Sequence, residues 1–210
     1  MKINNDLMLP ALCGFEDVKR FWDKHQGCYA AKILPGEYYV TLNNECITTV
    51  LGSCVSACVR DVKLGIGGMN HFMLPGRRSD YDDSIISEAA RYGNYAMEHL
   101  INTILSNGGS RDSLEFKIFG GAKILKEMLG IGQKNIDFIT EYMETEGFNI
   151  SVSDLGDVFP RKIVYFPKTG RVLMKRLQSV HNKTVIEREN KYKDILEKGP
   201  LQGDIELFSI

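Results

Sequence analysis

Short segments in which apolar and polar residues alternate occur along most of this chain, and this alternation is typical of half-buried β-strands. The predicted strands are Tyr38–Val40, Cys46–Val50, Val55–Asp61, Ile66–Leu74, "SLEFKIFGGA", "FNISVSDLG" and "RKIVYFPKTGRVLMKRL". We expect the last segment to form a hairpin that turns at Pro167–Gly170, because proline and glycine favour turns.

Apolar residues at helical spacing mark fewer segments. The clearest is "DDSIISEAARYGNYAMEHLINTILSNGG", which Asp83 or Ser84 could cap and which Gly108 and Gly109 would end. Other helices are predicted in "EDVKRFWDKH", "AKILKEMLG", Asn135–Gly147 and the charged segment "QSVHNKTVIERENKYKDILEK". Many strands, few helices and no strict βαβ repeat favour α+β packing rather than a doubly wound sheet.

Composition and charge then exclude several classes of protein. The chain has 210 residues, which is enough for one sizeable core, and its formal net charge is −1. A chain so close to neutral has no strong field to attract nucleic acid or anionic lipid. It lacks a stretch of about 18 apolar residues that could span a membrane, and it lacks a secretory signal sequence. We therefore expect a cytoplasmic protein without membrane insertion, whose five cysteines are free thiols.

The segment "ITTVLGSCVSACVRDVKLGIGGMNHFMLP" holds the candidate chemistry. If Val55–Arg60 and Gly65–Asn70 form an antiparallel hairpin around the loop Asp61–Leu64, Cys54 lies directly opposite His71. Opposite residues share a face, with Cα atoms about 4.5–5.5 Å apart, so the thiol and the imidazole would touch. The loop lacks the usual residues of a tight turn, and a slip of one residue would place the pair on opposite faces.

A thiol beside an imidazole is the minimum for nucleophilic catalysis, because an imidazolium lowers the pKa of the thiol and favours the thiolate. The glycine before Ser53 would let backbone N–H groups approach an oxyanion. Two other interpretations stay open. One is a buried hairpin with a structural cysteine. The other is a zinc site of Cys46, Cys54, Cys58 and His71, although these residues lack the C-x-x-C spacing of structural zinc sites. We interpret the other cysteines and histidines as structural or surface residues: Cys13, Cys28, Cys46, Cys58, His25, His99 and His181.

The segments "LGSCVSACVRD" and "GGMNHFMLP" closely resemble the chemoreceptor glutamine deamidase family, CheD. Other segments match the family in order along the chain: "LPGEYYVT", "RYGNYAM", "KIFGGAKI", "IGQKN", "DLG" and "KTGRVLMKRL". The resemblance implies a single α/β sandwich domain, similar to the catalytic fold of cytotoxic-necrotizing-factor-type deamidase toxins. It divides the chain into an N-terminal extension (1–33), a deamidase domain (34–177) and a charged helix with a C-terminal tail (178–210).

The resemblance also implies a Cys-His-Thr catalytic triad. The cysteine of "GSC" is Cys54, the histidine of the "HxMLP" motif is His71, and the threonine is Thr48, with Thr49 beside it. The chain must fold back after Val50 for Thr48 to reach the site. Cys54 would attack the side-chain carboxamide of a receptor glutamine, His71 would transfer protons, and Thr48 would orient the imidazole. No cofactor and no metal are implied.

Two regions differ from the family pattern. After "DLG", Asp157 stands where a second glycine is common, and Phe159 stands where an arginine is common. Beyond the family domain, Gln178–Lys198 lacks a broad apolar face, so we expect it to pack weakly or to extend from the body. The terminal "GDIELF" is apolar enough to dock in a groove, and a frayed end is the alternative.

The partners implied by the resemblance are methyl-accepting chemotaxis receptors, as substrate, and a CheC-type phosphatase. Two alternative functions remain. A binding module could keep the fold without catalysis, but it would have no need of Cys54, His71 and Thr48 together. A receptor methylesterase would need the same triad, so the sequence does not separate it from a deamidase.

Overall fold

The computed structural model describes residues 8–75, 83–124, 130–178 and 183–198. In this part of the chain, ten strands form two five-stranded sheets, accompanied by three α-helices and a short 3₁₀ helix. Both sheets contain parallel and antiparallel neighbours, so the architecture is mixed α/β. None of the described helices combines the length and the apolar composition needed to cross a bilayer.

The first sheet has the strand order β1-β2-β4-β9-β10. Its strands are β1 (Arg20–Asp23), β2 (Cys28–Lys32), β4 (Cys46–Leu51), β9 (Arg161–Phe166) and β10 (Arg171–Arg176). β2 and β4 are parallel, and the other neighbours are antiparallel. The predicted hairpin at the end of the family domain is confirmed as β9 and β10.

The second sheet has the order β3-β6-β5-β7-β8. Its strands are β3 (Tyr38–Thr41), β6 (Gly67–Asn70), β5 (Val55–Asp61), β7 (Leu114–Gly120) and β8 (Ile150–Leu155). β7 and β8 are parallel, and the others pair antiparallel. The 3₁₀ helix η1 (Arg111–Ser113) leads directly into β7. All the strands predicted in this region are present.

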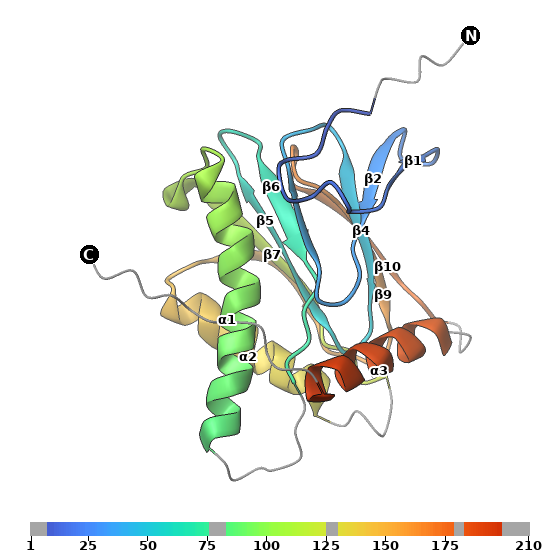
Figure 1. The fold of residues 1–210 in the computed structure, drawn as a ribbon, viewed down its shortest axis with the longest axis vertical. Helices are drawn as coiled ribbons and strands as arrows, with labels where there is room; N and C mark the ends of the chain where they lie inside the picture. The colour runs from blue at the N-terminus through green and yellow to red at the C-terminus, as the bar shows by residue number, and fades with distance from the viewer. Residues whose placement is uncertain (1–7, 76–82, 125–129, 179–182, 199–210) are drawn as a thin grey trace.

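The helices cover the sheets from two directions (Figure 1). α1 (Asp83–Ser106) packs on β3, β5 and β6, and α2 (Ile131–Thr145) packs on α1 and β5. α3 (Lys183–Lys198), coloured red, lies across one end of the sheets. One apolar core joins both sheets, with Ile47 and Ile163 from the first and Val55 and Ala57 from the second all fully buried.

The helix predicted in "EDVKRFWDKH" is wrong, because Arg20–Asp23 form β1. β1 pairs antiparallel with β2, and Gly27 adopts a positive φ of 66° in the turn between them. The carboxylate of Asp23 accepts hydrogen bonds from the backbone N–H groups of His25 and Gln26 and so stabilises this turn. Tertiary pairing with β2 therefore overrides the local helical spacing.

Residues that the sequence division places in an N-terminal extension take part in the first sheet. β2 lies within residues 1–33 and pairs in parallel with β4. Ala31 and Ile33 are buried in the same core as the strands of the predicted deamidase domain, and Phe15 is 5% exposed there. The division of the chain into three parts stays a prediction.

The hairpin of β5 and β6 has a different register from the predicted one. Cys58 pairs with Met69, so the strands are displaced by two residues from the predicted pairing. The Asp61 carboxylate accepts hydrogen bonds from the backbone N–H groups of Lys63 and Leu64, and this longer loop produces the shift. A shift of two residues preserves the faces, so Cys54 and His71 remain on the same side of the hairpin.

Several predictions fall on residues outside the described ranges. They are the helix in "AKILKEMLG", most of which is 125–129, the position of His181 and the docking of the terminal "GDIELF". The structure describes the backbone of Asp83 and Ser84 in α1, but not their predicted capping side chains.

Asp157, which stands where the family pattern commonly has glycine, has an unusual backbone conformation. Asp157 has φ 65°, and it is the only non-glycine residue with positive φ in the described part of the chain. This left-handed conformation favours glycine, which agrees with the glycine common in the family at this position. Its carboxylate lies 3.3 Å from the guanidinium of Arg176, an ion pair that a glycine could not form.

Candidate active site

Cys54 ends a tight loop, residues 52–54, between β4 and β5. The three carbonyl oxygens of this loop all accept hydrogen bonds from the body of the protein. Gly52 O accepts from Ala122 N at 2.8 Å, Ser53 O from Asn135 Nδ2 at 2.9 Å, and Cys54 O from Gly121 N at 2.8 Å. Because all three carbonyls are held in this way, the N–H groups of the loop are free to converge on another partner.

That partner is the carboxylate of Glu189 in α3. Its Oε1 accepts hydrogen bonds from Gly52 N at 2.7 Å and Cys54 N at 3.4 Å. Its Oε2 accepts from Ser53 N at 2.9 Å and Ser53 Oγ at 2.7 Å. A Cβ on Gly52 would lie 2.7 Å from Oε2, so this approach requires glycine. Successive backbone N–H groups arranged in this way form an anion-binding nest.

His71 follows β6, and its ring is oriented by Thr49 of β4. The Thr49 hydroxyl donates to the carbonyl oxygen of Ile33 at 2.9 Å, and its Oγ1 lies 2.8 Å from His71 Nδ1. A hydroxyl has one proton, so Thr49 must accept the second bond and Nδ1 must carry the imidazole proton. Among the described residues, His71 Nε2 is the only buried side-chain nitrogen or oxygen without a hydrogen-bond partner. It therefore holds a free lone pair.

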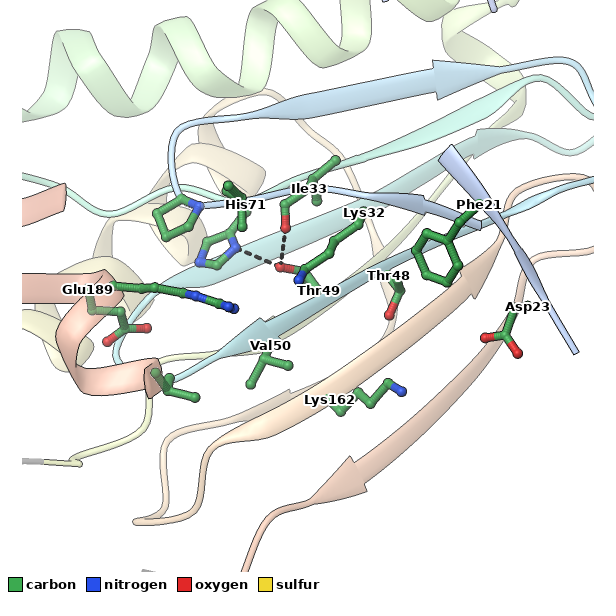
Figure 2. A pocket seen from close by; sticks show the side chains of 14 residues that line it. Phe21, Asp23, Lys32, Ile33, Thr48, Thr49, Val50, His71, Lys162 and Glu189 are labelled. Carbon is green, nitrogen blue, oxygen red and sulfur yellow. Dashed lines mark hydrogen bonds between the residues drawn. The ribbon is translucent and has the colours of Figure 1, made fainter. Parts of the chain in front are cut away.

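The hydroxyl that orients the imidazole is that of Thr49 and not that of Thr48, the residue predicted for this role. Its hydroxyl donates to the carbonyl oxygen of Ile163 at 2.9 Å, across the pairing of β4 with β9. Neighbouring residues of a strand point to opposite faces, so only one of Thr48 and Thr49 can face His71. Figure 2 shows Thr49 joined to His71 and Ile33, with Thr48 farther along the pocket toward Phe21 and Asp23.

The structure brings Cys54 and His71 together, with Glu189 as a third member. Cys54 Sγ, a ring nitrogen of His71 and a carboxylate oxygen of Glu189 all lie within 4.8 Å of one another. In the described ranges, this is the only group of histidine, cysteine and acidic side chains spaced to hold a metal ion. The zinc set that includes Cys46 and Cys58 is not assembled. Both oxygens of Glu189 already accept hydrogen bonds from the loop. The N–H groups of the loop therefore form a site for an anion, such as this carboxylate, rather than for a cation.

Burial controls the protonation of the site. Cys54 and His71 are 0% and 2% exposed. Burial lowers the pKa of His71 from 6.5 to about 3. Burial, together with the nearby carboxylate of Glu189, raises the pKa of the Cys54 thiol well above its ordinary value. The shift of the thiol is opposite to the one predicted from its histidine neighbour, so both groups are neutral while Glu189 is in place.

A pocket of about 290 Å³ adjoins the site (Figure 2). Thr49 and His71 line its inner wall, and Glu189 contributes to its wall from α3. Lys32 and Lys162 also line the pocket. A second pocket is lined by His71, by Tyr192 and by residues of α1.

The structure adds two residues that sequence reasoning missed. Asn135 is fully buried in α2, where its Nδ2 donates to Ser53 O and its Oδ1 accepts from Leu74 N at 2.8 Å. It thus joins the loop of Cys54 to the chain after His71, and its signal was its place in "IGQKN". Glu189 carried no comparable signal, because it is one of several acidic residues in a charged helix. The five cysteines are free thiols, as predicted.

Comparisons with known proteins identify the family of this chain. The family described as "CheD chemotactic sensory transduction" matches residues 73–176. A protein of Hahella chejuensis named "Probable chemoreceptor glutamine deamidase CheD" is 55% identical over 194 residues, 92% of each chain. A protein of the same name from Halorhodospira halophila is 49% identical over 209 residues, which cover 98% of this chain and 97% of that protein. The chain therefore belongs to the CheD family.

Proposed function

We propose that this chain hydrolyses the side-chain carboxamide of glutamine residues in chemoreceptors and acts in chemotaxis as a chemoreceptor glutamine deamidase. One observation carries the proposal. His71, whose Nε2 has a free lone pair, lies beside the Cys54 thiol, and three backbone N–H groups converge next to both. A base, a nucleophile and an oxyanion site in this arrangement are what hydrolysis of an amide through a thioester requires.

The first half of the reaction releases ammonia. His71 Nε2 takes the proton of the Cys54 thiol, and the thiolate attacks the carboxamide carbon. The N–H groups of residues 52–54 stabilise the negative charge that develops on the amide oxygen. His71 then gives its proton to the departing amine, and a thioester with Cys54 remains.

The second half consumes water. His71 removes a proton from a water molecule, whose oxygen attacks the thioester carbon, and the same N–H groups stabilise the second oxyanion. When the carbon–sulfur bond breaks, glutamate leaves and the Cys54 thiol recovers its proton. Thr49 acts as a positioning residue, since its oxygen holds the proton on Nδ1 and leaves Nε2 as the nitrogen that can accept a proton.

The test is mass spectrometry of cytoplasmic receptor fragments incubated with the full chain. We expect specific glutamine peptides to gain the mass difference between an amide and an acid, and ammonia to appear in equal amount. Cys54→Ala and His71→Ala should abolish the conversion and leave the melting temperature near that of the parent chain. Release of methanol from methylated receptors without deamidation would instead favour a methylesterase.

Two finer assignments belong to this proposal. Receptor glutamines lie on cytoplasmic helices in this family, so we place the enzyme in the cytoplasm. We also propose a CheC-type phosphatase as a second partner, which is supported by the family resemblance alone. Size-exclusion chromatography of the two purified proteins tests this partner, and separate elution at micromolar concentration would argue against it.

A further inference from the structure

The proposed reaction produces a glutamate side chain, and Glu189 is such a side chain bound in the proposed active site. It is a glutamate side chain on a helix, it is 1% exposed, and its carboxylate occupies the anion nest beside Cys54 and His71. The reacting side chain of a substrate has to place its amide oxygen in the same nest. The nest cannot hold both groups at once, so the site as it stands is closed to substrate.

Residues of α3 before and after Glu189 also contact the site, so the similarity to a bound substrate helix extends beyond the carboxylate. Val185, four residues before Glu189, is 8% exposed and lines the pocket that Thr49 also lines. Tyr192, three residues after it, forms a hydroxyl–hydroxyl contact with Tyr92 of α1. Residues at these spacings lie on one face of a helix. α3 therefore inserts one face into the site.

The body of the protein is shaped to receive this face. A Cβ on Gly36 would lie 2.5 Å from the hydroxyl oxygen of Tyr192, so the close approach of Tyr192 depends on a glycine there. Leu196, one further turn along, is 7% exposed and lines the second pocket. The face of α3 that points away from the body is charged and exposed, and it includes Glu187. Few apolar side chains hold the helix, which is consistent with its release.

We propose that α3 is an internal product-like helix that occupies the substrate groove, and that a receptor helix binds by displacing it. This inference rests on the proposed function and adds to it the side chains that flank the reacting glutamine. The substrate is a glutamine on a helix, with an apolar residue four positions before it and an aromatic or apolar residue three positions after it. These side chains take the places of Val185 and Tyr192 when α3 leaves.

The first experiment measures access to Cys54 and does not depend on the reaction. Iodoacetamide labelling of the full chain is followed by peptide mapping for the parent, Glu189→Ala, Tyr192→Ala and Glu187→Ala. We expect Cys54 to react about tenfold faster in the first two variants, a factor in keeping with the loss of contacts of this strength. Glu187→Ala, which changes an exposed acid on the same helix, should label like the parent.

Cys58 serves as an internal control, because it is fully buried in the core and away from α3. Its labelling should stay slow in all variants. Tyr192→Ala separates release of the helix from removal of the Glu189 charge. Unchanged labelling of Cys54 in both Glu189→Ala and Tyr192→Ala overturns the proposal. Acceleration that is matched at Cys58 also overturns it, since it would report loss of the core rather than release of α3.

The second experiment asks whether position 189 is the position of the reacting side chain. In Glu189→Gln, the enzyme carries an amide at that position, and we expect it to convert this amide to the acid with release of ammonia. Glu187→Gln and the double variant Glu189→Gln with Cys54→Ala should keep their amides. Mass spectrometry of the α3 peptide gives the result.

The outcomes separate this proposal from the proposed function. If receptor fragments are deamidated but the amide introduced at position 189 persists, the product-like position of Glu189 is wrong. If neither is converted while Cys54 labelling is accelerated in Glu189→Ala, the deamidase function fails and the covering role of α3 stands. Conversion at position 189, together with faster deamidation of receptor fragments by Glu189→Ala than by the parent, supports both.

Discussion

His71 shows how one side chain depends on a chain of contacts. The carbonyl oxygen of Ile33 fixes the proton of the Thr49 hydroxyl, Thr49 fixes the proton on Nδ1, and Nε2 is left as the base. The family resemblance assigns the orienting threonine to Thr48, whereas the hydroxyl beside the imidazole is that of its neighbour Thr49. The choice between the two threonines depends on the pairing of β4 with β9, which a sequence pattern does not specify.

The first prediction compares the two threonines. Thr49→Val removes the acceptor for Nδ1–H and frees the ring to take the wrong tautomer, so we expect the deamidation rate to fall by at least about 10²-fold. Thr48→Val removes only a bond to the Ile163 carbonyl and should keep a rate within a few-fold of the parent. The measurement is ammonia release from a receptor fragment. A larger loss in Thr48→Val than in Thr49→Val would contradict the assignment.

The second prediction concerns the pH dependence of stability. The pKa of His71 is lowered to about 3 in the fold, against 6.5 ordinarily, so below pH 6.5 the unfolded chain binds a proton that the folded chain does not. Stability from this group is therefore lost as pH falls from 6.5 toward 3, by about 2 kcal/mol at pH 5. Urea unfolding at pH 7 and pH 5 measures it. His71→Gln should lack this contribution, and an equal pH dependence in both proteins would exclude it.

At the scale of elements, α2 joins the two halves of the site through Asn135. The amide bridges the loop of Cys54 and the chain after His71, so the separation of nucleophile and base depends on a helix far from both in sequence. The helix itself was predictable from its apolar spacing, although it begins at Ile131 rather than at Asn135. The matching segment "IGQKN" drew attention to Asn135 but not to its role, because a buried amide and an exposed one are identical in a sequence.

The third prediction tests this bridge. Asn135→Ala leaves the N–H of Leu74 and the carbonyl of Ser53 buried without these partners, which should cost about 2–4 kcal/mol in the free energy of unfolding. Gln133→Ala is the matched control, since Gln133 is an exposed amide on the same helix, bonded to Asp137. Its effect should stay below about 0.5 kcal/mol. Similar losses in the two variants, measured by urea unfolding, would contradict the bridging role.

The elements that sequence reasoning misjudged share a cause. β1 has helical spacing but is held by β2, and the β5–β6 register is set by the side chain of Asp61 at the end of β5. α3 was expected to pack weakly or to extend from the body; extension is wrong, because Glu189, Val185 and Leu196 are buried, and the buried carboxylate of Glu189 was not foreseen. In each case, the structure that forms depends on a contact between residues distant in the sequence or on a contact made by a polar side chain. Local periodicity, which identified most strands and α1, does not contain that information.

At the scale of the whole molecule, the site exists only when both sheets and the helices are assembled. Thr49 comes from the first sheet, Cys54 and His71 flank strands of the second, and Glu189 closes the site from α3. The α/β class could be inferred from the pattern along the chain and the family resemblance, and the Cys–His pair from one stretch of sequence. The closing of the site by the chain's own C-terminal helix could not, since α3 lies outside the segments that carry that resemblance.

The last prediction concerns the N-terminal residues, which the sequence division sets apart from the deamidase domain. A chain that begins at Leu34 loses β1 and β2, the buried side chains of Phe15 and Ile33, and the carbonyl that orients Thr49. Loss of the two side chains alone should lower the free energy of unfolding by about 3–6 kcal/mol.

Deamidation by this shortened chain should fall with its stability, because His71 loses its support through Thr49 and Ile33. The control is a chain that begins at Met8, which keeps Phe15, β1 and β2 and should be more stable than the chain that begins at Leu34. Thermal and urea unfolding of the three proteins, followed by the receptor assay, makes the comparison. Equal stability and equal activity in all three would mean that residues 34–210 fold and act without β1 and β2. The first sheet would then owe its stability to β4, β9 and β10 alone.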